Sequence, residues 1–262
     1  MKRLVTRLFL VVLAGLIASP SAAELAPTGV LRVVFLGSNP VQGRVDAATG
    51  AIRGVIADLV PALARKIGKP YRIIPVTDAA AVMESVRTGE ADVALLALEA
   101  SRSMQVEFSI PYLLMGNAYL VRADSPLQRS ADVDRAGITV GSVRGQSQQV
   151  WVSENLKYAQ VRMWPAVPAA NEIVRVLTSG EVQAFAANRP RMEDVARMSP
   201  QVRVLADNFT TIGQALVVRK GDAAGVAELN AFLREAIASG LVKAAIDKAQ
   251  LAGVEVAPLP AR

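Results

Sequence analysis

The segment from Gly89 to Tyr112 holds the residues of this chain that are best placed for binding chemistry. Its apolar run Asp92–Leu98 (DVALLAL) follows a Gly-Glu turn and has the length of a buried strand in a parallel sheet. Open α/β sheets bind ligands just beyond the carboxyl ends of such strands, where Glu99 and Arg102 stand. A guanidinium is a planar fork of donors that matches a carboxylate, so Arg102 predicts capture of a small anion, although the pattern also suits an ordinary surface arginine.

The composition excludes most catalytic and metal-binding chemistry. The chain contains no histidine and no cysteine, which are the usual transition-metal ligands and the usual partners of catalytic nucleophiles. Any proton transfer would therefore fall to carboxylates, with Glu99 and Asp78 as candidates. The turn Gly141–Ser147 (GSVRGQS) lacks the lysine and the spacing of a nucleotide P-loop, which leaves phosphate binding a minor option. We predict no metal and no cofactor.

Residues 1–23 have the pattern of a cleavable secretory signal. A basic start is followed by the eleven-residue apolar run Leu8–Ala18 and by the small residues Ser21–Ala23. The apolar run is too short to cross a bilayer, so a permanent membrane anchor is the weaker interpretation. Without cysteine, the chain cannot carry a lipidated cysteine either. We expect a soluble protein in the periplasm of a Gram-negative bacterium.

The charge of the mature chain is mild. The predicted signal holds three of the 29 basic residues and none of the 23 acidic residues, which leaves 26 basic against 23 acidic, or +3. The basic residues are scattered and aromatic residues are few, so the sequence does not predict binding to nucleic acid.

The order of elements repeats along the chain, and the repeat predicts two similar lobes. Each half is a βαβαβ unit, so each needs a mainly parallel sheet that is flanked by helices. The sequences VRTGEADVALLA and VLTSGEVQAFAA occupy the same place in the two halves. The first half is predicted as strand Leu31–Leu36, a helix ending at Gly68, strand Tyr71–Val76, helix Ala80–Thr88 and strand Asp92–Leu98; the second as strand Ile138–Ser142, helix Ser147–Asn155, strand Gln160–Trp164, helix Ala169–Thr178 and strand Val182–Ala187.

The chain resembles the periplasmic solute-binding proteins that capture polar amino acids for ABC importers, over residues 29–251. Each motif is weak alone, but their order and spacing are specific. The matching motifs are Gly29-Val30-Leu31-Arg32-Val33, Gly54-x-x-x-Asp58-Leu59, Gly89-x-x-Asp92, Arg102, Phe108-Ser109-x-Pro111-Tyr112, Gly137-x-Thr139-Val140-Gly141, Gly145-Gln146-Ser147 and Leu216 to Asp222 (LVVRKGD).

The resemblance implies a two-lobed type II periplasmic binding fold that closes on its ligand by hinge motion. Lobe one would comprise residues 24–115 and 212–262, and lobe two residues 116–211, with chain crossings near 112–116 and 210–214. In this family, the arginine that matches Arg102 binds the α-carboxylate of the ligand. The turn that holds Gln146 and Ser147 adds contacts from a helix N-terminus, where free N–H groups favour an anion. Asn39 and Tyr112 complete the predicted ligand-binding set, together with Glu99 and Asn188.

Two departures from the family pattern put a standard amino acid ligand in doubt. Members place an aspartate at the end of the last lobe-two strand to pair with the ligand's ammonium, and Asn188 stands there instead. The loop Leu98–Ser101 is about two residues shorter than the family pattern. Glu99 either supplies the missing negative charge or pairs with Arg102 in the empty protein, and their closeness favours pairing.

These observations predict a monomeric binding protein that delivers a small, carboxylate-bearing solute to an ABC permease in the inner membrane. Two alternatives remain. One is an enzyme on the same fold, similar to the periplasmic cyclohexadienyl dehydratases, which would use Glu99 or Asp78. The other is an accessory or sensory protein that has lost its ligand. Arg189 and Arg191, which follow Asn188, could line the cleft, but solvated helix positions are the default expectation.

Overall fold

The computed structural model describes residues 25–260, and the predicted signal segment, residues 1–23, lies outside them. The helices are α1 (Ile56–Ile67), α2 (Ala79–Thr88), α3 (Ser147–Asn155), α4 (Ala170–Thr178), α5 (Arg189–Met198), α6 (Ala223–Ala238) and α7 (Leu241–Ala249), with the 3-10 turns η1 (Arg102–Met104) and η2 (Ser130–Asp132). The strands are β1 (Leu31–Leu36), β2 (Arg44–Val45), β3 (Ile52–Arg53), β4 (Tyr71–Val76), β5 (Val93–Ala97), β6 (Val106–Arg122), β7 (Thr139–Val143), β8 (Gln160–Trp164), β9 (Ala184–Asn188), β10 (Val202–Val204), β11 (Thr210–Arg219) and β12 (Val254–Val256).

The predicted order of strands and helices is confirmed in both halves, with element ends within two residues of the prediction. Helix α1 ends at Gly68, whose φ of 67° lies in the left-handed region that glycine reaches without steric cost. The repeat extends to the turns that follow α2 and α4, because Gly89 and Gly180 both adopt a left-handed conformation there. None of the described helices is long and apolar enough to cross a membrane.

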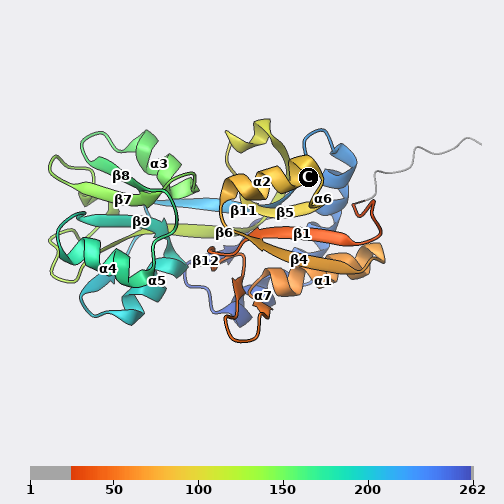
Figure 1. Ribbon diagram of the computed structural model, residues 1–262, viewed down its shortest axis with the longest axis horizontal. Coiled ribbons are helices and arrows are strands. Elements are labelled where there is room, and N and C mark those ends of the chain that lie inside the picture. The colour runs from red at the N-terminus through yellow and green to blue at the C-terminus, as the bar shows by residue number, and fades with distance from the viewer. Residues whose placement is uncertain (1–24, 261–262) are drawn as a thin grey trace, which may run out of the picture.

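One long mixed sheet joins the two halves, in the order β4-β1-β5-β11-β6-β9-β7-β8. In the first half β1 runs parallel to β4 and β5, and in the second half β7 runs parallel to β8 and β9. Strands β6 and β11 run antiparallel to each other through the middle, and Figure 1 shows them extending from one lobe into the other. The predicted two-lobed α/β fold is therefore confirmed.

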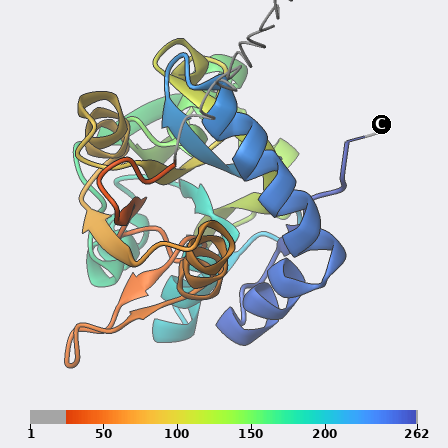
Figure 2. The same cartoon turned by 90° about the vertical axis from the view of Figure 1, so that its right-hand side faces the viewer.

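The middle strands change neighbours where the chain passes between lobes. Strand β6 pairs with β12 and β11 at residues 113–115, and with β9 at residues 117–121. Helices α6 and α7 then lie beside α1, as Figure 2 shows in blue, so the chain ends on the first half. We propose that the lobes divide at these stretches, with residues 24–115 and 212–262 as lobe one and residues 116–211 as lobe two.

Apolar side chains fill both faces of the sheet in each lobe. In lobe one, α1, α6 and α7 cover a cluster on one face that contains Phe35 and Leu63, and α2 covers a second cluster with Val86. In lobe two, α4 and α5 cover a cluster around Phe185, and α3 packs over a cluster that contains Val152. These four clusters hold the strand ends at the lobe junction in fixed positions.

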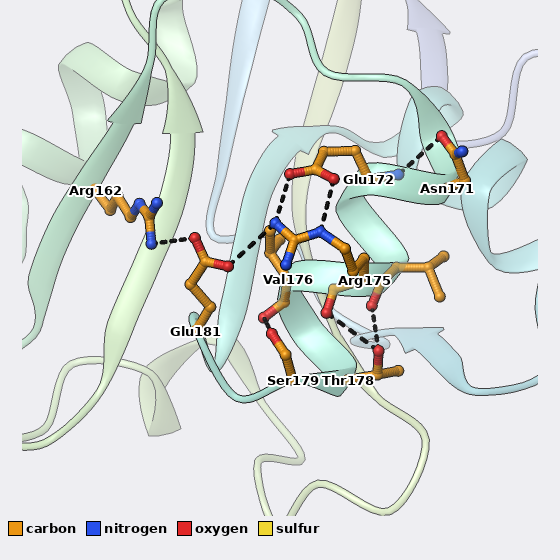
Figure 3. A network of polar contacts seen from close by, with 9 residues as sticks. Arg162, Asn171, Glu172, Arg175, Val176, Thr178, Ser179 and Glu181 are labelled. Atoms are coloured by element: carbon orange, nitrogen blue, oxygen red, sulfur yellow. Dashed lines mark hydrogen bonds and ion pairs between the residues drawn. The ribbon is translucent and has the colours of Figure 1, made fainter.

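Figure 3 shows a network on the surface of lobe two that ties α4 to β8. The carboxylate of Glu181, in the turn after α4, accepts from Arg162 of β8 and from Arg175 of α4, the latter at 3.2 Å. Arg175 also binds Glu172 one turn earlier on the helix, at 2.7 Å, which lowers the pKa of the Glu172 carboxyl. Because the partners are largely exposed, the network contributes little to stability.

Candidate ligand-binding site

A small, polar cavity lies where the two lobes meet, at the carboxyl ends of β1 and β5. Its volume is about 20 Å³, which is room for about one water molecule. A ligand of amino acid size therefore enters only if the lobes separate. The cavity is lined by Leu36, Asn39, Gln42, Ala79, Leu96, Ala97, Arg102, Met115, Gln146, Ser147, Gln148, Asn188 and Gln214.

Larger hollows exist elsewhere on the surface, and two of them each contain an ion pair. One of them, of about 560 Å³, lies around Arg32 and Asp92 at the opposite end of lobe one. These two side chains form a two-pronged ion pair with contacts of 2.5 and 3.1 Å. A second hollow, of about 370 Å³, contains Asp58 and Lys248, which also pair with each other. We take the junction cavity as the candidate site because it gathers the buried polar side chains of both lobes.

Among the described residues that line this cavity, Arg102 alone carries a charge, and it joins the lobes. It begins turn η1, which a four-residue loop separates from β5, and its side chain is buried. Nη1 donates to the carbonyl oxygen of Ala97 at 3.0 Å within lobe one, and Nη2 donates to that of Gly145 in lobe two at 2.9 Å. Three of its five N–H groups remain for other partners. Burial lowers the pKa of Arg102, while the nearby Glu99 carboxylate raises it.

The N-terminus of α3 brings further donors to the same cavity from lobe two. The capping residue Gln146 makes no side-chain hydrogen bond to the helix, so the first N–H groups of α3 are left open. Ser147 at the first helical position is buried beside Arg102 in the lining of the cavity. A guanidinium and a helix N-terminus on one cavity favour an anionic group between them.

Buried amides from both lobes complete the cavity. Asn188 ends β9 and caps α5, where its Oδ1 accepts the N–H of Arg191 at 3.0 Å. Its Nδ2 lies 3.5 Å from Oδ1 of Asn39, so the structure brings these two predicted residues together across the junction. Arg102, Gln146, Ser147, Asn188 and Asn39 therefore share one cavity.

Glu99 and Tyr112 do not line this cavity. Glu99 is half-buried, and the structure does not contain the ion pair that we expected between it and Arg102, because Arg102 donates to backbone carbonyls instead. Burial raises the pKa of Glu99, with Glu154 of α3 adding to the rise and Arg102 opposing it. Tyr112 is packed in the core of lobe one, and burial raises the pKa of its phenol. Asp78, the other candidate carboxylate, caps α2 by accepting from Ala81 at 2.9 Å.

The sequence interpretation missed four buried amides. Gln42 and Gln214 bind each other in lobe one at 3.1 Å, and Gln148 donates to Asn117 in lobe two at 2.6 Å. The burial of Gln214 could be predicted, because a glutamine inside the apolar strand TIGQALVV must be buried and hydrogen-bonded. The others lie in loops, at a helix start or in a long mixed strand, where no local pattern marks them as buried.

The expectation that Arg189 and Arg191 are solvated is wrong. Both are largely buried, and Arg189 donates to the carbonyl oxygens of Leu205 and Asp207 at 3.0 and 2.8 Å. Arg191 donates to the carbonyl oxygen of Pro168 at 2.6 Å. These arginines satisfy loop carbonyls, which the helical pattern of α5 alone does not reveal.

Residues 31–250 match the family described as bacterial extracellular solute-binding proteins, family 3. The chain belongs to this family. A curated glutamine-binding protein of Geobacillus stearothermophilus is 23% identical over 177 residues, which cover 64% of this chain and 64% of that protein. The match thus spans somewhat under two thirds of that relative.

Solved structures show the same fold. A mutant of ArgBP from T. maritima is 24% identical with a TM-score of 0.71, covering 87% of this chain and 97% of that one. AbpA from Streptococcus pneumoniae bound to L-arginine is 21% identical with a TM-score of 0.72, covering 88% and 98%. An ancestral amino acid-binding protein described as a precursor of cyclohexadienyl dehydratase is 23% identical with a TM-score of 0.72, covering 87% and 97%.

Proposed function

We propose that this protein captures a small, carboxylate-bearing solute in the periplasm and delivers it to the permease of an ABC importer. The observation that carries the proposal is the position of Arg102. Its buried guanidinium lies at the junction of the lobes, next to the open N-terminus of α3, and already bonds to a lobe-two carbonyl. A carboxylate placed there would accept from the guanidinium and from the helix N–H groups together.

The relatives support a ligand of amino acid size. One is named for binding glutamine, and one was solved with L-arginine bound. Both ligands carry a carboxylate, which is the group that Arg102 is placed to bind. The chain would act as a monomer, and the predicted signal segment would place it in the periplasm.

Capture requires the lobes to open and close again, because the present cavity is too small for such a ligand. Opening would break the contact from Arg102 to Gly145, the approach of Asn188 to Asn39, and the ion pair between Arg44 and Asp194. A ligand that bridges the lobes would replace the first two contacts. Ligand binding would thereby be coupled to closure, which a permease can recognise.

A thermal-shift screen of carboxylates and amino acids, followed by calorimetry on the best binder, tests this proposal. Arg102→Ala should keep the fold but weaken binding of a carboxylate by about 2 to 5 kcal/mol, because a charge-assisted contact in a desolvated cleft is lost. Arg87→Ala, on the exposed face of α2, is the matched control and should bind as the parent does. A carboxylate that binds Arg102→Ala with unchanged affinity would contradict the proposal.

The enzyme alternative is favoured by one observation, the raised pKa of Glu99 beside the cleft. A carboxyl group with a raised pKa can transfer protons at neutral pH. Against this, Glu99 is absent from the residues that line the cavity.

A further inference from the structure

The backbone fixes the orientation of two buried glutamines at the cavity. The N–H of Leu36 donates to Oε1 of Gln42 at 2.9 Å. This contact identifies the oxygen of the Gln42 amide, so the nitrogen Nε2 points the other way. That nitrogen donates to Oε1 of Gln214 at 3.1 Å, which fixes the second glutamine in turn. The remaining group is Nε2 of Gln214, a fully buried donor that has no hydrogen-bond partner among residues 25–260.

Backbone N–H groups also fix the orientation of two asparagines at the cavity. The N–H of Val41 donates to Oδ1 of Asn39 at 3.1 Å, and the N–H of Arg191 donates to Oδ1 of Asn188 at 3.0 Å. Each amide oxygen is therefore held by its own backbone. The 3.5 Å approach of Asn188 Nδ2 to Asn39 Oδ1 is too long for a strong hydrogen bond. The NH₂ ends of both side chains are the parts left to bind a ligand.

The described lining of the cavity is consequently rich in donors and contains no acidic side chain. Its thirteen lining residues include Arg102 but no aspartate or glutamate. Among the described lining residues, the side-chain oxygens that accept no hydrogen bond are the hydroxyl of Ser147 and the amide oxygens of Gln146 and Gln148. An ammonium group would meet amide hydrogens there without a counter-charge, which makes its desolvation costly. An oxygen acceptor would instead satisfy donors that are otherwise unpaired, such as Nε2 of Gln214.

We infer that the site selects short carboxylic acids that carry a second oxygen acceptor at the far end, such as a second carboxylate, and no ammonium group. The inference rests on the proposed function, because the first carboxylate is the one assigned to Arg102. The second acceptor binds the amide donors of Gln214, Asn39 and Asn188. This ligand class differs from the amino acids named for the relatives.

Calorimetry with matched acids tests the inference. Glutarate carries two carboxylates, pentanoate keeps one carboxylate on a chain of the same length, and 5-aminopentanoate carries an ammonium at the far end. Succinate, butanoate and 4-aminobutanoate form a second, shorter set. In at least one set, the diacid should bind at least about tenfold more tightly than both partners, the affinity difference expected from one charge-assisted hydrogen bond.

Asn188→Asp provides the matched variant, since aspartate also caps helices and accepts the N–H of Arg191 but replaces the NH₂ donor by a negative oxygen. Diacid affinity should fall at least about tenfold, and binding of the amino-carboxylate should improve. Asn171→Asp, on the exposed start of α4, makes the same change of charge away from the cavity and should leave both affinities unchanged. Circular dichroism and the melting temperature check that each variant is folded.

The remaining outcomes separate the inference from the proposed function. Equal binding of diacid and monoacid, lost in Arg102→Ala, would overturn the inference and leave carboxylate capture standing. Tighter binding of an amino-carboxylate than of the diacid by the parent protein would also overturn the inference alone. Binding of none of the six acids would overturn the inference alone, and carboxylate binding that does not depend on Arg102 would overturn both.

Discussion

The guanidinium of Arg102 donates to the carbonyl oxygen of Gly145 across the junction of the two lobes, at 2.9 Å. Since the same guanidinium also holds Ala97 in lobe one, a single side chain ties the lobes together. The residue that is placed to bind a carboxylate thus also stabilises the closed form. Because a ligand enters only when the lobes separate, ligand entry involves the loss of the contact to Gly145.

This relationship predicts that Arg102→Ala shifts the empty protein toward the open form. The chain contains no cysteine, so spin labels can be attached at Ala238→Cys on α6 and Tyr158→Cys in lobe two without removing native thiols. Distances measured between these labels should lengthen or broaden in Arg102→Ala. The Arg87→Ala control should give the parent distribution. An unchanged distance in Arg102→Ala would mean that the other contacts across the junction suffice for closure.

The raised pKa of Glu99 predicts that the stability of the protein depends on pH. Its folded-state pKa is raised by burial and by Glu154, against the opposing effect of Arg102, so the folded protein binds the proton more tightly than the unfolded chain. The stability that this group contributes is present below its unfolded pKa and is lost as pH rises through the folded pKa. Glu99→Gln should therefore raise the melting temperature at pH 7 by up to about 3 °C, with the gain vanishing toward pH 4. An equal gain at both pH values would indicate a packing effect instead.

Replacing Arg189 should lower the free energy of unfolding more than replacing a typical arginine on the same helix. Arg189 donates to Oδ1 of Asn208 at 2.7 Å, in addition to the carbonyl oxygens of Leu205 and Asp207. Its side chain also packs against Gly253, where an added Cβ would lie 2.5 Å from Cδ of Arg189. Arg189→Met would leave these oxygens without their donor and should lower the free energy of unfolding by about 1 to 3 kcal/mol.

Arg197→Met is the matched control for that measurement, because Arg197 lies on the exposed face of α5 and pairs with Asp194. Its cost should stay within about 0.5 kcal/mol. Urea denaturation of both variants gives the comparison. An equal loss of unfolding free energy in the two variants would show that the carbonyl contacts of Arg189 contribute no more than a surface ion pair.

The fold could be predicted from the sequence because its signals are local and repeat. The helix that stops at Gly68, the strand 93–97 behind its Gly-Glu turn and the second copy of that turn at Gly180 follow from periodicity and glycine positions. The pairing of β6 with both β11 and β9 is a long-range property that no local pattern contains. It was accessible through resemblance to the family.

The site was harder to predict, because burial of a polar group depends on elements that are distant in the sequence. Arg102 could be placed by its position after a strand, but its carbonyl partner Gly145 stands 43 residues further on. Gln42 and Gln214, 172 residues apart, become a pair when the second crossing returns the chain to lobe one. Tyr112 was assigned to the site from its place in a motif, whereas the strand pleat turns it into the core of lobe one.

The final prediction separates binding from catalysis. A receptor should return its ligand unaltered, so a carboxylate that stabilises the protein in the thermal-shift screen should be recovered intact after prolonged incubation and examined by mass spectrometry. Glu99→Gln should change affinity at most, because Glu99 stands outside the residues that line the cavity. Conversion of the carboxylate by the parent protein that disappears in Glu99→Gln would overturn the receptor assignment, since the amide keeps the shape of the side chain but cannot transfer the proton. Conversion that persists in Glu99→Gln and in Asp78→Asn would point to a contaminating enzyme, because these were the carboxylates that the sequence offered for proton transfer.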